Sequence, residues 1–172
     1  MASGLGLIWL VSLVAGYGGG AMSTEPETGF DVTKNDAEWK QSLTRGQYCV
    51  LRQHDTEFAG SSPLLHERRQ GTFYCAGCGQ PLFSSDAKFD SGTGWPSFTA
   101  PLEEVIGTTV DSRLGMVRVE VHCRRCGGHL GHVFADGPAP TGLRYCLNGV
   151  ALTFKESGQG VPSGTSPTRP AR

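Results

Sequence analysis

Apolar and polar residues alternate cleanly over residues 116–122. One face of an extended backbone there carries Val117, Val119 and Val121, and the other carries Arg118, Glu120 and His122. This period of two is typical of a half-buried β-strand, with one face against a core and the other toward water.

Shorter β-like runs occupy residues 72–74, 81–83 and 150–154. Turn-forming residues separate these pieces at 90–92, 136–138 and 141–142. We therefore expect several short strands joined by turns. The 25 glycines among 172 residues favour the same interpretation over long helices.

The pattern near the N-terminus is helical instead. Thr33 followed by Asp36 resembles a capping box, and Thr44 followed by Gln47 repeats the device. Trp39 fits the apolar face of the first helix, so we interpret it as a core anchor. Two short helices are predicted to cover one side of the strands, followed by a surface loop over residues 54–69.

The length fits one domain, and the net charge of -1 with scattered basic residues leaves no footprint for nucleic acid or an anionic membrane. The expected divisions are a possible signal peptide or upstream extension (1–21), a flexible lead-in (22–31), the domain (32–155) and a disordered tail (156–172). Residues 4–16 form an apolar run too short to span a bilayer. The protein is cytoplasmic if translation starts at Met22, and exported or organellar if the apolar run is a signal.

Four of the six cysteines form two CxxC pairs, each followed by glycine; they are Cys75, Cys78, Cys123 and Cys126. Glycine permits the tight turn that aims both sulfurs of a pair at one point, and four thiolates suit a closed, structural Zn²⁺ site. Two disulfides in an exported protein, or a redox CxxC, are the competing interpretations. The spacing and the repeated glycine favour one structural zinc ion per chain.

Cys146 stands apart from these pairs, as does Cys49. Arg144 lies two positions before Cys146, and alternate side chains of an extended backbone share a face. The guanidinium is therefore expected to favour the thiolate form of Cys146, which is the nucleophilic form of a cysteine.

His129 and His132 lie between the second CxxC pair and Cys146. An imidazole can donate a proton near neutral pH, as acid-assisted thiol chemistry needs. Zinc ligation by these histidines competes with this interpretation, although the four cysteines already complete a tetrahedron. A structural role in satisfying backbone groups also stays open.

A turn-rich segment, residues 92–98, places Trp95 between a glycine and a proline. Such a segment can hold an indole at the lip of a pocket, against which an apolar methyl group would pack. An ordinary core tryptophan is an equally good interpretation from the sequence alone.

These motifs occur in a fixed order: a CxxC pair, SGTGWPSF at 91–98, a second CxxC pair, HLGHVF at 129–134 and RYCLN at 144–148. The ordered set closely resembles the methionine-R-sulfoxide reductases, MsrB, over residues 33–154. The resemblance implies a mainly β fold, the zinc-bearing antiparallel β-tent of two small sheets with short N-terminal helices.

The resemblance also implies the roles of individual residues. Cys146 would be the nucleophile, supported by Arg144, while His129, His132 and Asn148 would orient the substrate and handle its oxygen. Trp95 would receive the substrate methyl group, with Phe134 beside it as a further substrate-binding residue. These assignments are expectations drawn from the family.

The implied chemistry reduces methionine-R-sulfoxide in peptides and proteins. The Cys146 thiolate attacks the sulfoxide sulfur while an acid, by resemblance His132, protonates the departing oxygen. Methionine leaves and Cys146 becomes a sulfenic acid, which a thiol must reduce.

The sequence departs from the family at the recycling step. Many members carry a resolving cysteine where this chain has Thr93, which leaves Cys49 as the spare internal thiol. We hypothesise a monomeric one-cysteine enzyme, recycled by thioredoxin or a small thiol, with Cys49 inert. A zinc-ribbon interaction module is one rival function, but it would not explain the His-rich segment or Cys146. A zinc-containing thiol peroxidase is the other, which would also use Cys146 but consume peroxide.

Overall fold

The computed structural model describes residues 29–158. The predictions for the possible signal peptide, for most of the lead-in and for most of the tail fall outside these residues. Among the described residues, no helix is long and apolar enough to cross a membrane.

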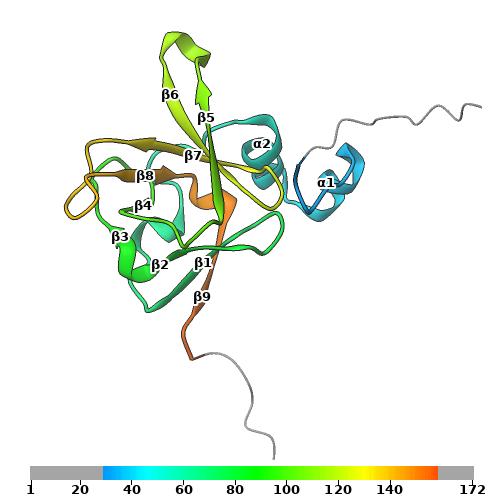
Figure 1. The fold of residues 1–172 in the computed structure, drawn as a ribbon. Helices are drawn as coiled ribbons and strands as arrows, with labels where there is room; N and C mark the ends of the chain where they lie inside the picture. Colours follow the sequence, from blue (N-terminus) through cyan, green and yellow to red (C-terminus); the bar gives the residue numbers. More distant parts are fainter. Residues whose placement is uncertain (1–28, 159–172) are drawn as a thin grey trace, which may run out of the picture.

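Two antiparallel sheets form the body of the domain (Figure 1). The smaller has the order β2 (Pro81–Ser84), β1 (Gly71–Cys75) and β9 (Leu152–Glu156). The larger has the order β3 (Lys88–Phe89), β4 (Ser97–Phe98), β8 (Arg144–Leu147), β7 (His129–Phe134), β6 (Arg118–Cys123) and β5 (Ile106–Asp111). Every pairing is antiparallel, which confirms the predicted mainly β class.

Two short helices precede the sheets, α1 (Asp36–Ser42) and α2 (Arg45–Gln53). The predicted capping box of Thr44 and Gln47 at the start of α2 is confirmed. The predicted cap of α1 at Thr33 is wrong, because Asn35 and Glu38 form that capping box instead. The side chain of Glu38 is long enough to reach back to the backbone of the N-cap residue, as a capping box requires. Asp36, which was predicted for that role, is instead the first residue of the helix.

The connection between α2 and β1 is irregular, as predicted, apart from a short 3-10 helix at Pro63–His66. Three further 3-10 helices lie at Ser85–Ala87, Arg113–Gly115 and Gly149–Ala151. The last of them follows the Cys146 strand directly, and it bears on the site described below.

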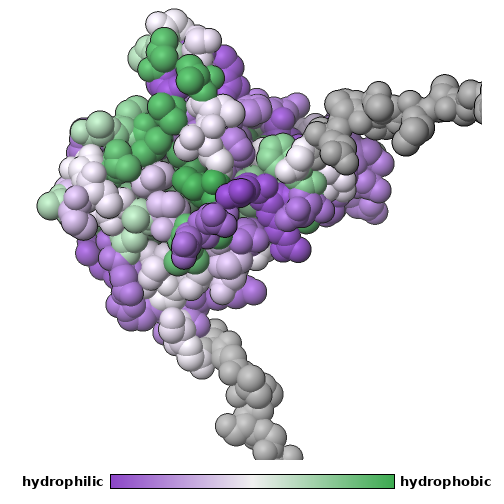
Figure 2. Space-filling view, viewed as in Figure 1, coloured by the Kyte–Doolittle hydropathy of each residue, from purple (hydrophilic) through white to green (hydrophobic). Residues whose placement is uncertain are grey.

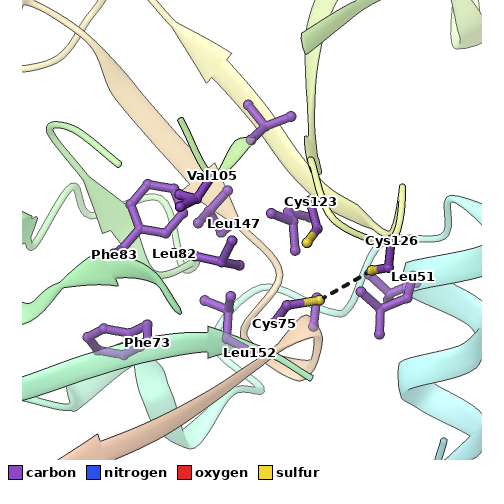
Figure 3. Packing of buried hydrophobic residues seen from close by; sticks show 14 of the residues in the cluster. Leu51, Phe73, Cys75, Leu82, Phe83, Val105, Cys123, Cys126, Leu147 and Leu152 are labelled. Carbon is purple, nitrogen blue, oxygen red and sulfur yellow. Dashed lines mark hydrogen bonds between the residues drawn. The ribbon is translucent and has the colours of Figure 1, made fainter. Parts of the chain in front are cut away.

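The core lies between the two sheets and beneath α2 (Figure 3). Phe73 from β1 contacts Phe98 from β4 with ring centroids 4.9 Å apart, and Phe83 from β2 contacts Phe98 at 4.6 Å. All three rings are fully buried, each stabilising the fold by roughly 1.5–3 kcal/mol relative to exposure. Trp39 is also buried, which confirms it as a core anchor.

The alternating stretch does form β6, and Val121 is buried as predicted, but the predicted faces are wrong for the outer part of the stretch. Val117 is 81% exposed and Val119 is 41% exposed, whereas Glu120 is 7% exposed. The outer part of the β5–β6 hairpin projects beyond the body, so its valines have no layer to pack against (Figure 1). Figure 2 shows the resulting apolar side chains on the projecting hairpin.

Candidate functional site

The four cysteines of the CxxC pairs converge on one point, with all four sulfurs within 4.8 Å of one another. The closest approaches are 3.7 Å between the sulfurs of Cys75 and Cys126 and 3.6 Å between those of Cys78 and Cys123. A disulfide needs sulfurs about 2 Å apart, so the geometry disfavours that interpretation. Four thiolates about 2.3 Å from a tetrahedral centre stand about 3.8 Å apart, which fits this cluster.

Each pair is presented by the same kind of turn. Gly79 and Gly127 both have positive φ, 73° and 66°, a backbone conformation that glycine adopts freely. Their amides donate to the carbonyls of Cys75 and Cys123 at 2.9 Å and 2.8 Å. The sequence prediction of two matching knuckles is therefore confirmed as geometry, and the cluster joins the end of β1 to the end of β6.

Cys146 lies within β8, paired with a neighbouring strand on each side. Strand pairing sets Ser97 of β4 on one side of it and His132 of β7 on the other. The side chain is half-buried beside a cavity of about 130 Å³. Residues of five segments line this cavity: Thr56, Trp95, Arg118, Gly131, His132, Phe134, Cys146, Leu147 and Asn148.

Trp95 takes the pocket position rather than the core position. Its side chain is half-buried, it lines the cavity, and its indole N–H donates to the carbonyl of Glu57 at 3.2 Å. Phe134 lies on the same cavity, with its ring centroid 6.4 Å from that of His132. The cavity therefore offers two aromatic walls beside one thiol.

Gly131 allows the two central strands to approach closely at this point. Its φ is +155°, and a Cβ there would lie 2.1 Å from the carbonyl oxygen of Cys146. No side chain fits that space, so glycine between the two histidines keeps β7 against β8 behind the thiol.

A buried carboxylate fixes His132. Its Nε2 lies 2.8 Å from Oδ2 of Asp111, which also accepts from Arg118 Nη2 at 2.8 Å. Arg113 binds the other carboxylate oxygen at 2.8 Å. The hydrogen bonds from Arg113 and His132 hold the pKa of Asp111 well below its usual range. The ring of His132 is thereby oriented, with Nδ1 left as its second nitrogen.

His129 lies behind the cavity, 1% exposed, and is not one of the residues that line it. Its Nδ1 lies 2.6 Å from Oε1 of Glu120, which also lies 2.9 Å from Nδ1 of His54. Burial lowers the pKa of His129 to about 4, although the bond to Glu120 opposes that shift. The imidazole is therefore neutral at pH 7 and acts as a hydrogen-bond donor to Glu120.

Arg144 shares a strand face with Cys146, as predicted, but its strongest partner is Asp136. Its Nε and Nη2 donate to the two oxygens of that carboxylate at 2.9 Å and 2.8 Å. The hydrogen bonds to Asp136 raise the pKa of Arg144, opposed by burial and helped by the charge of Cys146. The guanidinium also lies 4.6 Å from the ring centroid of Phe134.

The amide of Asn148 is occupied by backbone groups. Its Nδ2 donates to the carbonyl of Leu130 at 3.1 Å, and its Oδ1 accepts from the amide of Glu57 at 3.0 Å. Asn148 lines the cavity, yet both ends of its amide anchor neighbouring segments. Its position therefore depends on a loop far away in the sequence.

Thr93 lies next to the thiol. Its Oγ1 is 3.9 Å from Sγ of Cys146 and 2.9 Å from Oγ of Ser91. Cys49, in contrast, is half-buried in α2 and lines a separate cavity between that helix, the following loop and β9. The residue beside Cys146 thus carries a hydroxyl, and the spare thiol of Cys49 lies at another cavity.

Several residues of this site carry no motif and escaped sequence reasoning: Glu57, Asp111, Arg118, Glu120 and Asp136. The one usable signal was Glu120, a charged residue within a strongly β-patterned stretch. Its alternation could equally mark a solvent face, and only the pairing of β6 with β7 distinguishes the two.

Comparison with known proteins matches residues 43–156 to the SelR domain. A protein of Leptospira interrogans named peptide methionine sulfoxide reductase MsrB is 52% identical, covering 74% of this chain and 98% of its own length. Proteins with the same name from Bradyrhizobium diazoefficiens and Methanosarcina barkeri are 55% and 53% identical, covering 72% and 75% of this chain and 90% and 92% of their own lengths. With the cysteine cluster and the Cys146 cavity in place, these matches show that the chain belongs to the MsrB family of methionine sulfoxide reductases.

Proposed function

We propose that this protein reduces the R epimer of methionine sulfoxide in peptides and proteins, with Cys146 as the nucleophile. The observation that carries the proposal is the placement of one half-buried thiol beside a small cavity with two aromatic walls. Trp95 and Phe134 suit the apolar methyl group of a methyl sulfoxide, and the family membership names the reaction class.

The proposed first step is attack of the Cys146 thiolate on the sulfoxide sulfur, which forms a sulfur–sulfur bond while the protonated oxygen leaves the substrate sulfur as water. Water then adds to the Cys146 sulfur and the sulfur–sulfur bond breaks, which releases methionine and a proton and leaves Cys146 as a sulfenic acid. The substrate sulfur gains two electrons and Cys146 loses two, so cysteine and methionine sulfoxide become cysteine sulfenic acid and methionine. Protonation of the departing oxygen is needed to make it a good leaving group.

His132 is the proposed acid. It lines the cavity and lies opposite Cys146 across the β7–β8 pair, and Asp111 holds its Nε2. His129 is the weaker candidate, because it is buried behind the cavity and its pKa is lowered to about 4. A neutral His129 bound to Glu120 supports the position of β7 instead.

Recovery of Cys146 is proposed to use an outside thiol, either thioredoxin or a small dithiol. Two thiols reduce the sulfenic acid, releasing water and forming one disulfide. Thr93 cannot form a disulfide with Cys146, and Cys49 lines a different cavity. We propose that the protein completes this cycle as a monomer.

The Cys₄ cluster is proposed to hold one Zn²⁺, through Cys75, Cys78, Cys123 and Cys126. Four thiolates of this spacing match the tetrahedral preference of zinc. When bound, zinc would stabilise the junction of the two sheets, because a site closed by four protein ligands leaves no position for substrate.

The test offers the protein the two separated epimers of a blocked methionine sulfoxide, with dithiothreitol as reductant. Chromatography should show loss of the R epimer alone and its conversion to methionine. The same preparation receives hydrogen peroxide in a parallel assay, because a thiol peroxidase would also use Cys146. Consumption of the S epimer, or of peroxide in preference to both sulfoxides, would refute the proposal.

A further inference from the structure

Glu57 belongs to no sequence motif, yet its backbone binds two residues of the Cys146 cavity. It lies half-buried in the loop between α2 and the 3-10 helix at Pro63–His66. Its amide donates to Oδ1 of Asn148 at 3.0 Å, and its carbonyl accepts from Nε1 of Trp95 at 3.2 Å. One residue of the loop therefore orients both an amide and an indole of the cavity wall.

The side chain of Glu57 binds the turn that follows the Cys146 strand. Its two carboxylate oxygens accept from the amide of Gly149 at 2.5 Å and from the amide of Val150 at 2.9 Å. These amides begin the 3-10 helix Gly149–Ala151, where backbone N–H groups lack partners within the helix. Charge-assisted bonds to a carboxylate are roughly twice as strong as neutral ones, so this contact fixes the turn firmly.

The rest of the loop after α2 contacts the same two segments, the one that carries Trp95 and the one that follows Cys146. The amide of Gly60 donates to the carbonyl of Gly94 at 2.7 Å, directly before Trp95. Gly149 packs so closely against Ser62 that a Cβ would lie 1.9 Å from the serine Oγ. The neighbour of Glu57, Thr56, is itself part of the cavity wall. A displacement of this loop would therefore move the cavity from several sides.

We propose that Glu57 is a positioning residue of the active site. Its carboxylate fixes the turn after Cys146, and this contact keeps the backbone of Glu57 where it holds Asn148 and Trp95. The proposal rests on the proposed sulfoxide reduction, in which Trp95 receives the substrate methyl group. Glu57 itself does not touch the reacting atoms; it determines where the groups that bind substrate stand.

The test compares the zinc-loaded wild-type protein with Glu57→Gln, in which the side chain keeps its length and one acceptor oxygen but gains an amide facing a backbone N–H. We expect kcat/KM toward a methionine-R-sulfoxide peptide to fall about tenfold, mostly through KM, because misplaced binding groups weaken substrate capture. The variant Glu103→Gln, which removes an exposed carboxylate elsewhere, is the matched control and should keep wild-type constants.

A spectroscopic measurement separates positioning from simple stabilisation. The emission difference between each protein and its Trp95→Phe counterpart isolates Trp95 from the other two of the three tryptophans. In Glu57→Gln this difference spectrum should shift to longer wavelength, while the melting temperature and zinc content stay near those of the wild type.

Wild-type kinetic constants in Glu57→Gln would overturn the proposal. So would a loss of activity that follows the fraction of unfolded protein while the Trp95 emission stays unchanged. If the wild-type protein itself fails to reduce the sulfoxide, the proposed function is refuted, and the Trp95 emission alone then decides whether Glu57 positions that indole.

Discussion

The four cysteines of the CxxC pairs and the single Cys146 carry the same side chain in very different surroundings. The sulfurs of the CxxC pairs are held in turns, close to one another and mostly buried. Cys146 lies in the interior of a strand with a histidine and a cavity as neighbours. Burial among other thiolates suits a metal, whereas access to a cavity beside a proton donor suits a nucleophile.

The difference teaches that the surroundings, and not the residue type, assign the role. In the proposed function both regions serve one reaction, but they should fail in different ways. Loss of a cluster thiolate should remove the fold and with it the activity. Loss of the Cys146 thiol should remove the activity and leave the fold.

The largest expected effect comes from Cys126→Ser. Apparent free energies of zinc binding in small structural sites are about 10–16 kcal/mol, comparable to or larger than the whole stability of a typical domain. The variant should lose its metal and its cooperative thermal transition, as measured by elemental analysis and circular dichroism. Cys49→Ser, the control, should keep both. A Cys126→Ser protein that melts like the wild type would show that the cluster does not hold the fold.

Cys146→Ser should give the opposite result. Activity toward methionine-R-sulfoxide should fall by about 10³-fold or more, because a hydroxyl is a far poorer nucleophile than a thiolate. Zinc content and melting temperature should match those of the wild type. Retained activity in this variant would remove the distinction between the two groups of cysteines and would support a binding role for the chain.

His132→Gln should lower kcat/KM by about 10²-fold, the usual contribution of a positioned general acid. Glutamine can still bind Asp111 but cannot donate the proton to the departing oxygen. His66→Gln, at an exposed histidine outside the cavity, is the control for loss of an imidazole. An equal loss in both variants, or none in either, would exclude His132 as the acid.

Thr93→Cys should have the smallest effect on the rate of sulfoxide reduction. It should instead change how Cys146 is reduced back to the thiol after turnover. A cysteine at this position would place its sulfur near the Thr93 Oγ1, 3.9 Å from the Cys146 sulfur, so a small loop movement closes a disulfide. After one turnover without reductant, mass spectrometry should find the 93–146 disulfide in the variant. In the wild type it should find a sulfenic acid that dimedone traps, and a Cys49–Cys146 disulfide there would contradict the one-cysteine cycle.

The features of this molecule that depend on residues close together in the sequence could be predicted. The CxxC turns depend on residues three apart, and the capping box of α2 depends on Thr44 and Gln47, so both could be predicted correctly. At the start of α1 the sequence pattern led to the wrong capping box, Thr33 with Asp36, in place of Asn35 with Glu38. The difference between Thr33 and Asn35 rests on the reach of Glu38, a local detail that the pattern alone does not rank.

Contacts between distant segments could not be predicted. Glu57 meets Gly149 across 92 positions, and Asp111 meets His132 across 21. The inward turn of Glu120 and the exposure of Val117 both follow from where the β5–β6 hairpin leaves the body. Alternation defines two faces of a strand, but the neighbouring strands decide which of them is covered.

The pairing of Cys78 with Cys123 has a consequence for chain entropy. These residues are 45 positions apart, and the segment between them carries Thr93, Trp95, strands β2 to β5 and most of β6. A metal ion bound in the cluster would tie the ends of that segment together. On the chain-entropy model, closing a loop of this length stabilises the folded state by about 4 kcal/mol, because it lowers the conformational entropy of the unfolded chain. Trp95 and Arg118 of the cavity wall lie in this tethered segment. A metal ion that never contacts the substrate would therefore still stabilise part of the wall that binds it.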